Sequence, residues 1–298
     1  FDNWFSQKEL SITKKIEESI SEIKKRGLIY EKEGAVWFRS TDFGDDKDRV
    51  LIKSDGTLTY ITPDIAYHRD KFLRGFVRLI NIWGPDHHGY ISRLKAAVTA
   101  LGFEDESVNI LIVQLVTLYK DKVPVPMSTR EGRFITLKEL ISETGKDAAR
   151  YFFLMRKIDS HLDFDMELAK KHTAENPVFY VQYAHARISG IIKKAGIKTP
   201  SLMDSNLALL TQAKEIELVK LTVRFPEIVK QAGSSLEPYR LIPYLENLAK
   251  AFHSFYDKHK VICPDTELTH ARLALIEAVR IVIKNGLTLT GVSAPEEM

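Results

Sequence analysis

Apolar positions change their spacing near residue 135 of this 298-residue chain. Before that point, short apolar runs that predict strands alternate with stretches of helical spacing. After it, apolar residues recur three and four positions apart in every long segment, and strand signals disappear. The pattern predicts an α/β part followed by an all-α part.

The first 135 residues carry the signals of a mixed α/β fold. Residues 8–25 show one helical stripe, and Gly27 follows as a stop signal. Thr62 and Pro63 predict the start of a further helix, with Thr62 as its N-cap. Short strands are expected at residues 35–38, 50–52 and 58–61.

A parallel pair of strands is predicted next. Apolar runs at residues 77–83 and 108–115 predict buried strands, and residues 91–101 between them predict a helix. Strand, helix and strand in this order indicate a parallel βαβ unit. Ligands of such sheets bind beyond the carboxyl ends of the strands.

The remainder of the chain predicts a helical bundle joined to the α/β domain. Glycine and proline fall mainly between the periodic segments, where helices would end. The expected helices are residues 137–144, 146–156, 166–194, 207–232, 238–260 and 266–290.

Composition narrows the class of protein. Hydrophobic residues make up 44% of the chain, which predicts a globular protein. The lone Cys263 excludes a disulfide framework and a cysteine-based zinc site, and it fits a reducing compartment. No apolar run reaches the ~18 residues of a membrane span, so we expect no membrane partner and a cytoplasmic location.

The charge and the start of the chain add two expectations. The net charge of +3 lies entirely in residues 171–298, which permits a contact with nucleic acid without demanding one. The first residues lack an initiator methionine and the pattern of a signal peptide. We therefore expect a fragment or a processed product.

Tyr60 and Asp64 are the first candidate site residues. They surround the expected helix start, so both side chains should point toward one crevice. A carboxylate beside an aromatic ring suits a guanidinium, which pairs with the carboxylate and packs on the ring. The alternative is that Asp64 only complements the helix dipole.

Residues 83–89 form the second candidate, because they follow a buried strand and precede a helix. His87 and His88 are adjacent, which points their rings apart, so we do not expect a metal site. Contact with a substrate and simple capping of the loop both remain open.

The loop at residues 123–134 is a candidate phosphate site. It contains Ser128, Thr129 and two arginines after a strand, and hydroxyl, backbone N–H and guanidinium groups can hold phosphates. Surface loops of this composition are also common without a ligand.

One helical face near residue 180 combines aromatic residues with arginine. Tyr180, Tyr183 and Arg187 share this face by their spacing of three and four. Such a face could stack RNA bases, or the tyrosines could pack between helices.

Seven segments together resemble arginyl-tRNA synthetase, a class I aminoacyl-tRNA synthetase. Their number, order and spacing make chance resemblance implausible, and they cover almost the whole chain. The segments are FDNWFS (1–6), FGDDKDRV (43–50), WGPDHHGY (83–90), DAARYFF (147–153), LDFD (162–165), YAHAR (183–187) and GVSAPEEM (291–298).

The resemblance implies an enzyme that activates L-arginine with ATP and Mg²⁺ and then esterifies tRNA(Arg). Tyr60 and Asp64 match the family's arginine-recognition pair, and Asp86 falls at another arginine contact. His87 and His88 lie in the same loop and are expected to contact ATP.

The family also assigns roles to a mobile loop and to the helical part. Residues 126–130 match the ATP loop with the K-M-S-K-S signature, so Met127, Ser128, Thr129 and Arg130 are expected at ATP, with Ser128 and Arg130 catalytic. The expected tRNA contacts are Tyr180, Tyr183, Arg187 and Met298.

By the same resemblance, the fold is the second half of a Rossmann-type parallel-sheet catalytic domain followed by an α-helical anticodon-binding bundle. The expected parts are residues 1–136 (catalytic), 137–169 (stem contact) and 170–298 (anticodon binding).

Three departures from the family pattern bear on activity. The H-I-G-H motif is absent from the sequence, and the signature lysines are replaced by Pro126 and Thr129. Gln7 stands where the family usually carries glutamate, so a neutral amide, rather than a carboxylate, is expected near arginine. We therefore expect no arginyl-adenylate from this chain alone, and we expect the missing N-terminal catalytic half to be either a separate partner chain or a part that was cut from this one. The alternative is a non-catalytic tRNA-binding protein derived from a synthetase half.

Overall fold

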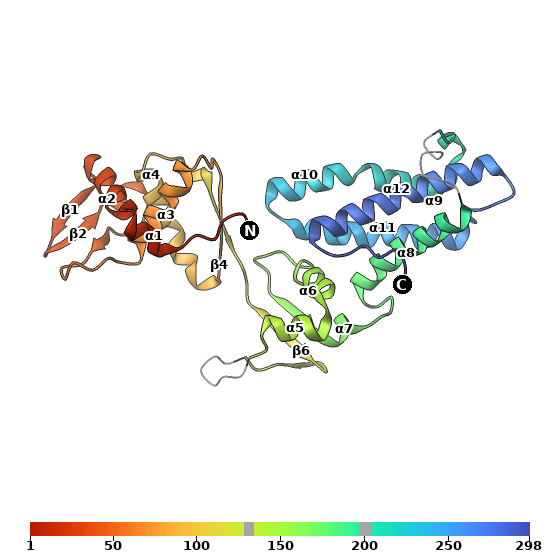
Figure 1. Cartoon of the computed structure of the whole chain (residues 1–298), viewed down its shortest axis with the longest axis horizontal. Helices are drawn as coiled ribbons and strands as arrows, with labels where there is room; N and C mark the ends of the chain where they lie inside the picture. The colour runs from red at the N-terminus through yellow and green to blue at the C-terminus, as the bar shows by residue number, and fades with distance from the viewer. Residues whose placement is uncertain (128–133, 197–203) are drawn as a thin grey trace. The chain divides into compact units, whose positions relative to one another are not determined.

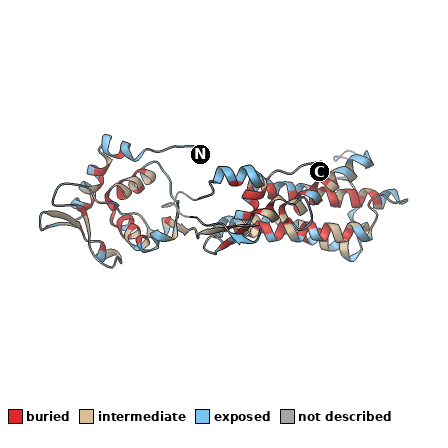
Figure 2. Cartoon of the chain, turned by 90° about the horizontal axis from the view of Figure 1, so that it is seen from below, coloured by how far each residue is buried: buried red, intermediate tan, exposed pale blue. Residues whose placement is uncertain are grey.

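The computed structural model describes residues 1–127, 134–196 and 204–298. The chain forms two compact units, Phe1–Gln114 and Leu115–Met298, each with its own hydrophobic core. Figure 1 labels their elements, and Figure 2 shows that buried residues gather inside each unit. None of the described helices combines the length and the apolar character that crossing a membrane requires.

The first unit begins with two short helices, α1 (Gln7–Ile12) and α2 (Lys15–Lys25). The prediction of one continuous helix over residues 8–25 is wrong, because Lys14 adopts a left-handed conformation with a φ of 58°. This turn lets Leu10 and Ile16 both pack against Ala66.

An antiparallel sheet follows, with strands β1 (Ile29–Lys32), β2 (Ala35–Phe38) and β3 (Arg49–Ile52) in that order. A short 3₁₀ helix, Ser40–Phe43, lies between β2 and β3. The strands expected at 35–38 and 50–52 are confirmed. The strand expected at 58–61 is wrong, since Leu58 makes only an isolated bridge to Ile52.

Helix α3 (Ile61–Leu73) begins two residues earlier than expected, with Tyr60 at the N-cap position. Thr62 is not its N-cap: its side chain is buried, and its hydroxyl donates to the carbonyl oxygen of Leu51 at 2.7 Å. This bond ties the first turn of α3 to β3, so tertiary packing has replaced the expected local cap.

The predicted βαβ unit is confirmed. Strands β4 (Leu79–Trp83) and β5 (Val108–Ile112) pair in parallel, and α4 (Ile91–Ala100) connects them. Leu79 and Asn81 of β4 are buried, whereas Ile80 and Ile82 are exposed. The remaining short 3₁₀ helices of this unit are Pro85–Tyr90 and Asp105–Ser107.

The second unit also contains a small sheet, with strands β7 (Val123–Pro124), β6 (Val116–Lys120) and β8 (Leu162–Asp165). β6 and β8 are parallel. The expectation that strands stop near residue 135 is therefore wrong. β8 is short, and Leu162 and Phe164 alternate inward between two aspartates, which is a period-two signal within a helical region.

Helices and their connections make up the rest of the described residues of this unit. The predictions for 137–144 and 266–290 are confirmed, whereas the long segments 166–194 and 207–232 are each broken into separate elements. The helices are α5 (Leu137–Thr144), α6 (Lys146–Phe153), α7 (Met166–Lys170), α8 (Pro177–Ala195), α9 (Ala213–Val223), α10 (Phe225–Ser235), α11 (Leu241–Lys258) and α12 (Thr266–Thr290), with short 3₁₀ helices at Leu207–Leu209 and Pro238–Arg240.

The break before α8 has a local cause. Asn176 is buried, and its side chain accepts a hydrogen bond from the backbone N–H of Val178, while Pro177 occupies the first helical position. Both features are typical of a helix start.

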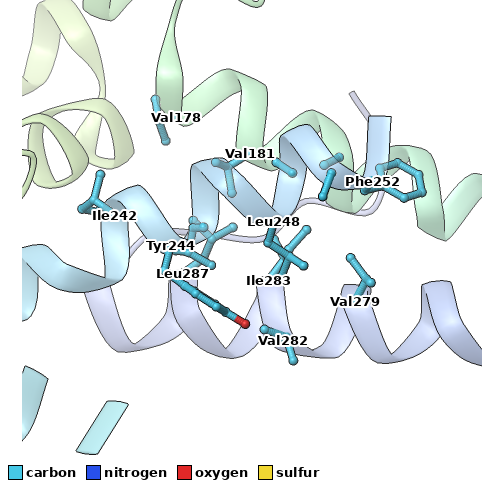
Figure 3. Close-up of a cluster of buried hydrophobic side chains, with 14 of the residues drawn as sticks. Val178, Val181, Ile242, Tyr244, Leu248, Phe252, Val279, Val282, Ile283 and Leu287 are labelled. Atoms are coloured by element: carbon cyan, nitrogen blue, oxygen red, sulfur yellow. The ribbon is translucent and has the colours of Figure 1, made fainter. Parts of the chain in front are cut away.

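The main core of the second unit lies between α8, α11 and α12, as Figure 3 shows. Phe252 and Leu248 of α11 and Ile283 of α12 have no exposed surface. Gly286 of α12 allows close approach to α11, because a Cβ at this position would lie 2.6 Å from a methyl group of Leu245. The all-α part expected from the periodicity is thus a packed helical bundle.

We predict that Glu215→Ala destabilises the second unit by about 3–5 kcal/mol. Glu215 has no exposed surface, and its carboxylate accepts a 2.8 Å hydrogen bond from the buried guanidinium of Arg272, which the substitution would leave unpaired. Urea unfolding of the whole chain, followed by helical circular dichroism, measures the effect.

Glu217→Ala on the same helix is the matched control. Glu217 is paired with Lys214 at 2.7 Å but is partly exposed, so its loss should cost less than about 1 kcal/mol. Equal losses for the two variants would contradict the importance of the buried pair.

Candidate functional site

A pocket of about 200 Å³ lies between α3 and β4 in the first unit. Aromatic rings form most of its wall, and a small set of polar groups faces it, which is typical of a ligand site. The lining residues are Tyr60, Asp64, Tyr67, His68, Lys71, Asn81, Trp83, His87 and Tyr90.

The carboxylate of Asp64 is the acidic group of this pocket. It lies in the first turn of α3, where the helix dipole favours a negative charge. The hydroxyl of Tyr90 donates to Asp64 Oδ2 at 2.8 Å. Partial burial nevertheless raises the pKa of Asp64, because removal from water disfavours the charged form. A cation that enters the pocket would stabilise the charged form of Asp64, which burial disfavours.

Aromatic rings surround this carboxylate. The side chain of Tyr60 is 71% exposed and stands at the start of α3, with its ring 5.8 Å from that of Tyr90 in an edge-to-face arrangement. Trp83 lies 5.6 Å from Tyr90 on the β4 side. The exposed ring of Tyr60 is thus free to cover a planar group that is bound at Asp64. The structure therefore brings together the two residues that sequence analysis paired.

A lysine also reaches the pocket. Lys71 lies two helical turns beyond Asp64, and its Nζ is 4.1 Å from the ring centroid of Tyr67. Burial, followed by the nearby charge of Arg74, lowers the pKa of Lys71. The pocket thus pairs one carboxylate with one partly desolvated ammonium group.

Two buried polar residues join α3 to β4. His68 and Asn81 are only 4% and 8% exposed. The amide Nδ2 of Asn81 is 2.9 Å from His68 Nε2, and His68 Nδ1 is 2.8 Å from the backbone oxygen of Asp64. Burial lowers the pKa of His68 to about 4, so the ring is neutral at physiological pH. Sequence analysis missed this group, although His68 and Lys71 follow Asp64 at spacings of four and seven.

The loop after β4 provides exposed histidines at the edge of the pocket. Asp86, His87 and His88 are all exposed. Only His87 lines the pocket, with its ring 6.1 Å from that of Trp83. Asp86 and His88 are not among the lining residues, and neither is Gln7, which is exposed at the start of α1.

The candidate ATP loop is only partly described. Met127 is exposed, and Ser128, Thr129 and Arg130 lie outside the described residues. Within the described ranges, no three His, Cys, Asp or Glu side chains are grouped so that they could hold a metal ion. Mg²⁺ commonly keeps its waters and binds through substrate phosphates, so its use with ATP does not require such a group.

A second candidate surface lies on α8 in the helical unit. Arg187 packs its guanidinium over the rings of Tyr183, at 5.8 Å, and Tyr256, at 4.3 Å. Tyr183 is 37% exposed and stacks on His253 of α11 at 5.9 Å. Tyr180 is only partly exposed and lies 4.9 Å from the same histidine. The predicted shared face exists, with Tyr183 as its exposed ring.

The C-terminal segment returns to this helix. Gln182 Nε2 donates to the backbone oxygen of Ser293 and to Asp147 Oδ2, both at 3.0 Å. His185 Nδ1 donates to the backbone oxygen of Pro295 at 2.7 Å. Met298 is exposed and lines a pocket of about 700 Å³.

Comparison with known proteins places these features in a class. Residues 6–189 match the family profile described as "tRNA synthetases class I (R), catalytic domain", and residues 181–298 match the "DALR anticodon binding domain". Together they define a class I aminoacyl-tRNA synthetase architecture. The chain belongs to the arginyl-tRNA synthetase family.

Individual relatives agree with this assignment. The whole chain is 53% identical to an arginine–tRNA ligase of Citrifermentans bemidjiense and 54% identical to one of Geobacillus kaustophilus. A crystal structure of an arginyl-tRNA synthetase of Thermus thermophilus covers 95% of the chain, and the chain covers 58% of it, with 20% identity and a TM-score of 0.79, which shows the shared fold. The chain spans about half the length of the curated relatives, 54% of each.

We predict that the His68 ring stays neutral down to about pH 4 in the folded protein. An unfolded histidine takes up a proton below about pH 6.5. Stability from the neutral ring is therefore complete above pH 6.5 and is lost as the pH falls toward 4, by about 1.4 kcal/mol per pH unit. NMR titration of the imidazole signals would show this.

The variant His68→Gln assigns the signal, because the imidazole resonance of His68 must be missing from its spectrum. The variant should also show a shallower loss of unfolding free energy between pH 6.5 and 4. A His68 midpoint near 6.5 would contradict the effect of burial.

Proposed function

We propose that this chain supplies the arginine pocket and the tRNA-binding bundle of an arginine–tRNA ligase, which activates L-arginine with ATP and esterifies tRNA(Arg). The observation that carries the proposal is the partly buried Asp64 carboxylate between aromatic rings. It is supported by relatives that are named arginine–tRNA ligase and match the chain over its whole length.

The pocket suits a guanidinium because of its charge and shape. The carboxylate of Asp64 accepts from Tyr90 through one oxygen and can accept from a planar N–H pair. Tyr60 would hold the guanidinium in the plane of the carboxylate by packing on its face. A lysine ammonium lacks this planar fork, so the site would favour arginine over lysine.

ATP would lie beside this pocket. We propose His87, His88 and Met127 at ATP, together with Ser128, Thr129 and Arg130, which lie outside the described residues. When bound, ATP would supply the α-phosphorus that the arginine carboxylate attacks, with pyrophosphate as the leaving group and arginyl-adenylate as the product. The chain's own part is to position the amino acid and neutralise developing charge, with Ser128 and Arg130 as the catalytic pair.

Two further residues belong to the proposal without support from the pocket geometry. We keep Gln7 and Asp86 as expected arginine contacts, although both are exposed outside the lining of the pocket. The H-I-G-H motif is absent from this sequence, so adenylate formation would need residues from outside it, in a separate N-terminal catalytic half. We propose a cytoplasmic location, where tRNA is charged.

The helical unit would bind the tRNA. Tyr183 offers an exposed ring beside Arg187, and base stacking with arginine support is a common means of holding unpaired RNA bases. We propose that Tyr180 and Met298 belong to the same tRNA-binding surface. The proposed parts remain catalytic (1–136), stem contact (137–169) and anticodon binding (170–298).

We predict that Asp64→Asn strongly weakens arginine activation and spares tRNA binding. Loss of a charge-assisted bond costs about 1.5–3 kcal/mol, which is roughly 10–150-fold in affinity for arginine. ATP–pyrophosphate exchange in the longest form of the protein that contains this chain measures the first effect, and filter binding measures the second.

Asp105→Asn is the control, because Asp105 is also an aspartate in the first turn of a helical segment of the first unit but does not line the pocket. Unchanged exchange in Asp64→Asn would remove Asp64 from the site. Specific tRNA binding with no exchange in the unmodified protein would support the non-catalytic alternative.

We predict that Tyr183→Ala weakens binding of tRNA(Arg) by about 1–3 kcal/mol through loss of a stacking surface. Binding is compared at two salt concentrations, because the unspecific contribution falls steeply with salt. Tyr239→Ala is the control, since Tyr239 also lies beside an arginine, at 5.8 Å, on another helix. Equal effects in the two variants would contradict a tRNA contact at Tyr183.

A further inference from the structure

Three side chains that line the candidate arginine pocket, those of His68, Asn81 and Lys71, form a chain of hydrogen bonds whose donors and acceptors can be assigned. A backbone carbonyl oxygen can only accept, so His68 Nδ1, 2.8 Å from the oxygen of Asp64, must carry the proton. Nε2 of the neutral ring is then an acceptor, and Asn81 Nδ2 must donate to it at 2.9 Å. This leaves Asn81 Oδ1 facing Lys71 Nζ at 3.5 Å.

The arrangement is buried and connects different elements. His68 and Lys71 belong to α3, whereas Asn81 comes from the middle of β4. Buried polar groups are costly unless each finds its partner, so such a network favours a single arrangement of its members. The network therefore fixes the rotation of α3 against β4.

That rotation decides where the Asp64 carboxylate points. Asp64 lies one helical turn before His68 on the same face of α3. Its carboxylate accepts a 2.8 Å hydrogen bond from the hydroxyl of Tyr90, which ends the 3₁₀ helix after β4. Thr62 ties the first turn of α3 to β3 through its hydrogen bond to Leu51. On the β4 side, the buried amide of Asn81 makes the corresponding contact with α3. A misplacement of about 1 Å at a binding group can cost on the order of 100-fold in function.

We propose that His68 and Asn81 are positioning residues that set the Asp64 carboxylate for a planar guanidinium and thereby determine selectivity for arginine over uncharged analogues. The inference rests on the proposed function, because it assigns a support to the same pocket. Neither residue needs to touch the ligand in this role. The other charged or titratable groups that line the pocket are Tyr60, Asp64, Tyr67, Lys71, His87 and Tyr90.

The test compares L-arginine with L-citrulline, whose ureido group has a similar shape without the charge. Calorimetric titration is carried out on the longest form of the protein that contains this chain. In Asn81→Leu, we expect arginine affinity to fall roughly tenfold or more and citrulline affinity to change less than about twofold. The selectivity ratio therefore falls.

Asn109→Leu is the matched control. Asn109 lies on the neighbouring strand opposite Ile80, and its side chain accepts a 2.7 Å bond from Arg78, but it does not line the pocket. This variant should keep the selectivity ratio of the unmodified protein. Equal loss of selectivity in both asparagine variants would overturn the proposal, because the effect would then belong to the sheet in general.

His68 provides a second pair of variants. His68→Gln retains an amide oxygen that can accept from Asn81, so we expect it to keep most of the selectivity, whereas His68→Leu should lose it. Thermal unfolding of each variant checks that it folds. Loss of selectivity in both His68 variants, with folding intact, would overturn the role of the hydrogen-bond chain.

A double-mutant cycle shows whether Asn81 acts through Asp64. In an Asp64→Asn background, Asn81→Leu should change the arginine-to-citrulline ratio no further. A further fall there would overturn the inference and leave the proposed function standing. If the unmodified protein does not prefer arginine and Asp64→Asn changes nothing, the proposed function itself fails.

Discussion

Partial removal of one carboxylate from water is the constraint on which the first unit depends. Asp64 is held between aromatic rings at the start of α3, where its pKa is raised by burial and its charge is supported by Tyr90 and the helix dipole. A site of this kind is costly when empty and favourable when a cation fills it. The packing of α3 against β4 and the hydrogen bond from Thr62 to β3 both help to keep that carboxylate in place.

In the second unit, packing of the helices holds aromatic and basic side chains at the surface of α8. α8 buries Val181 and Ile188 against the bundle and leaves Tyr183 partly exposed on its other side. Arg187 is held between two tyrosine rings, which limits its conformational freedom before any ligand binds. Rigid aromatic rings of this kind lose little conformational entropy when a planar group stacks on them.

Local sequence signals predicted much of the fold and half of the pocket. Helix α12 was predicted to the residue, because a 25-residue amphipathic segment with Asp265 before it is an unambiguous signal. The single helix over 8–25 was wrong because Lys14 adopts a left-handed conformation, and the strand at 58–61 was wrong because Leu58 makes only an isolated bridge and α3 already begins at Ile61. Tyr60 and Asp64 could be paired from their spacing.

The hydrogen bonds between His68 and Asn81 that hold α3 against β4 could not be predicted in the same way. Asn81 is one polar residue in an apolar strand, and its partner His68 is thirteen positions earlier on a helix. Nothing in the periodicity shows that a strand and a helix will meet with these two side chains opposed. Contacts of this kind depend on the register of packing, which only the folded arrangement reveals.

The return of the C-terminal segment onto α8 has a practical consequence for work with this protein. Backbone oxygens of Ser293 and Pro295 are held by Gln182 and His185, and Met298 lies at the edge of a large pocket. An affinity tag or a fluorescent protein fused after Met298 would lie beside α8, whose surface the binding experiments are meant to measure. Fusions and immobilisation chemistry are therefore better attached away from Met298.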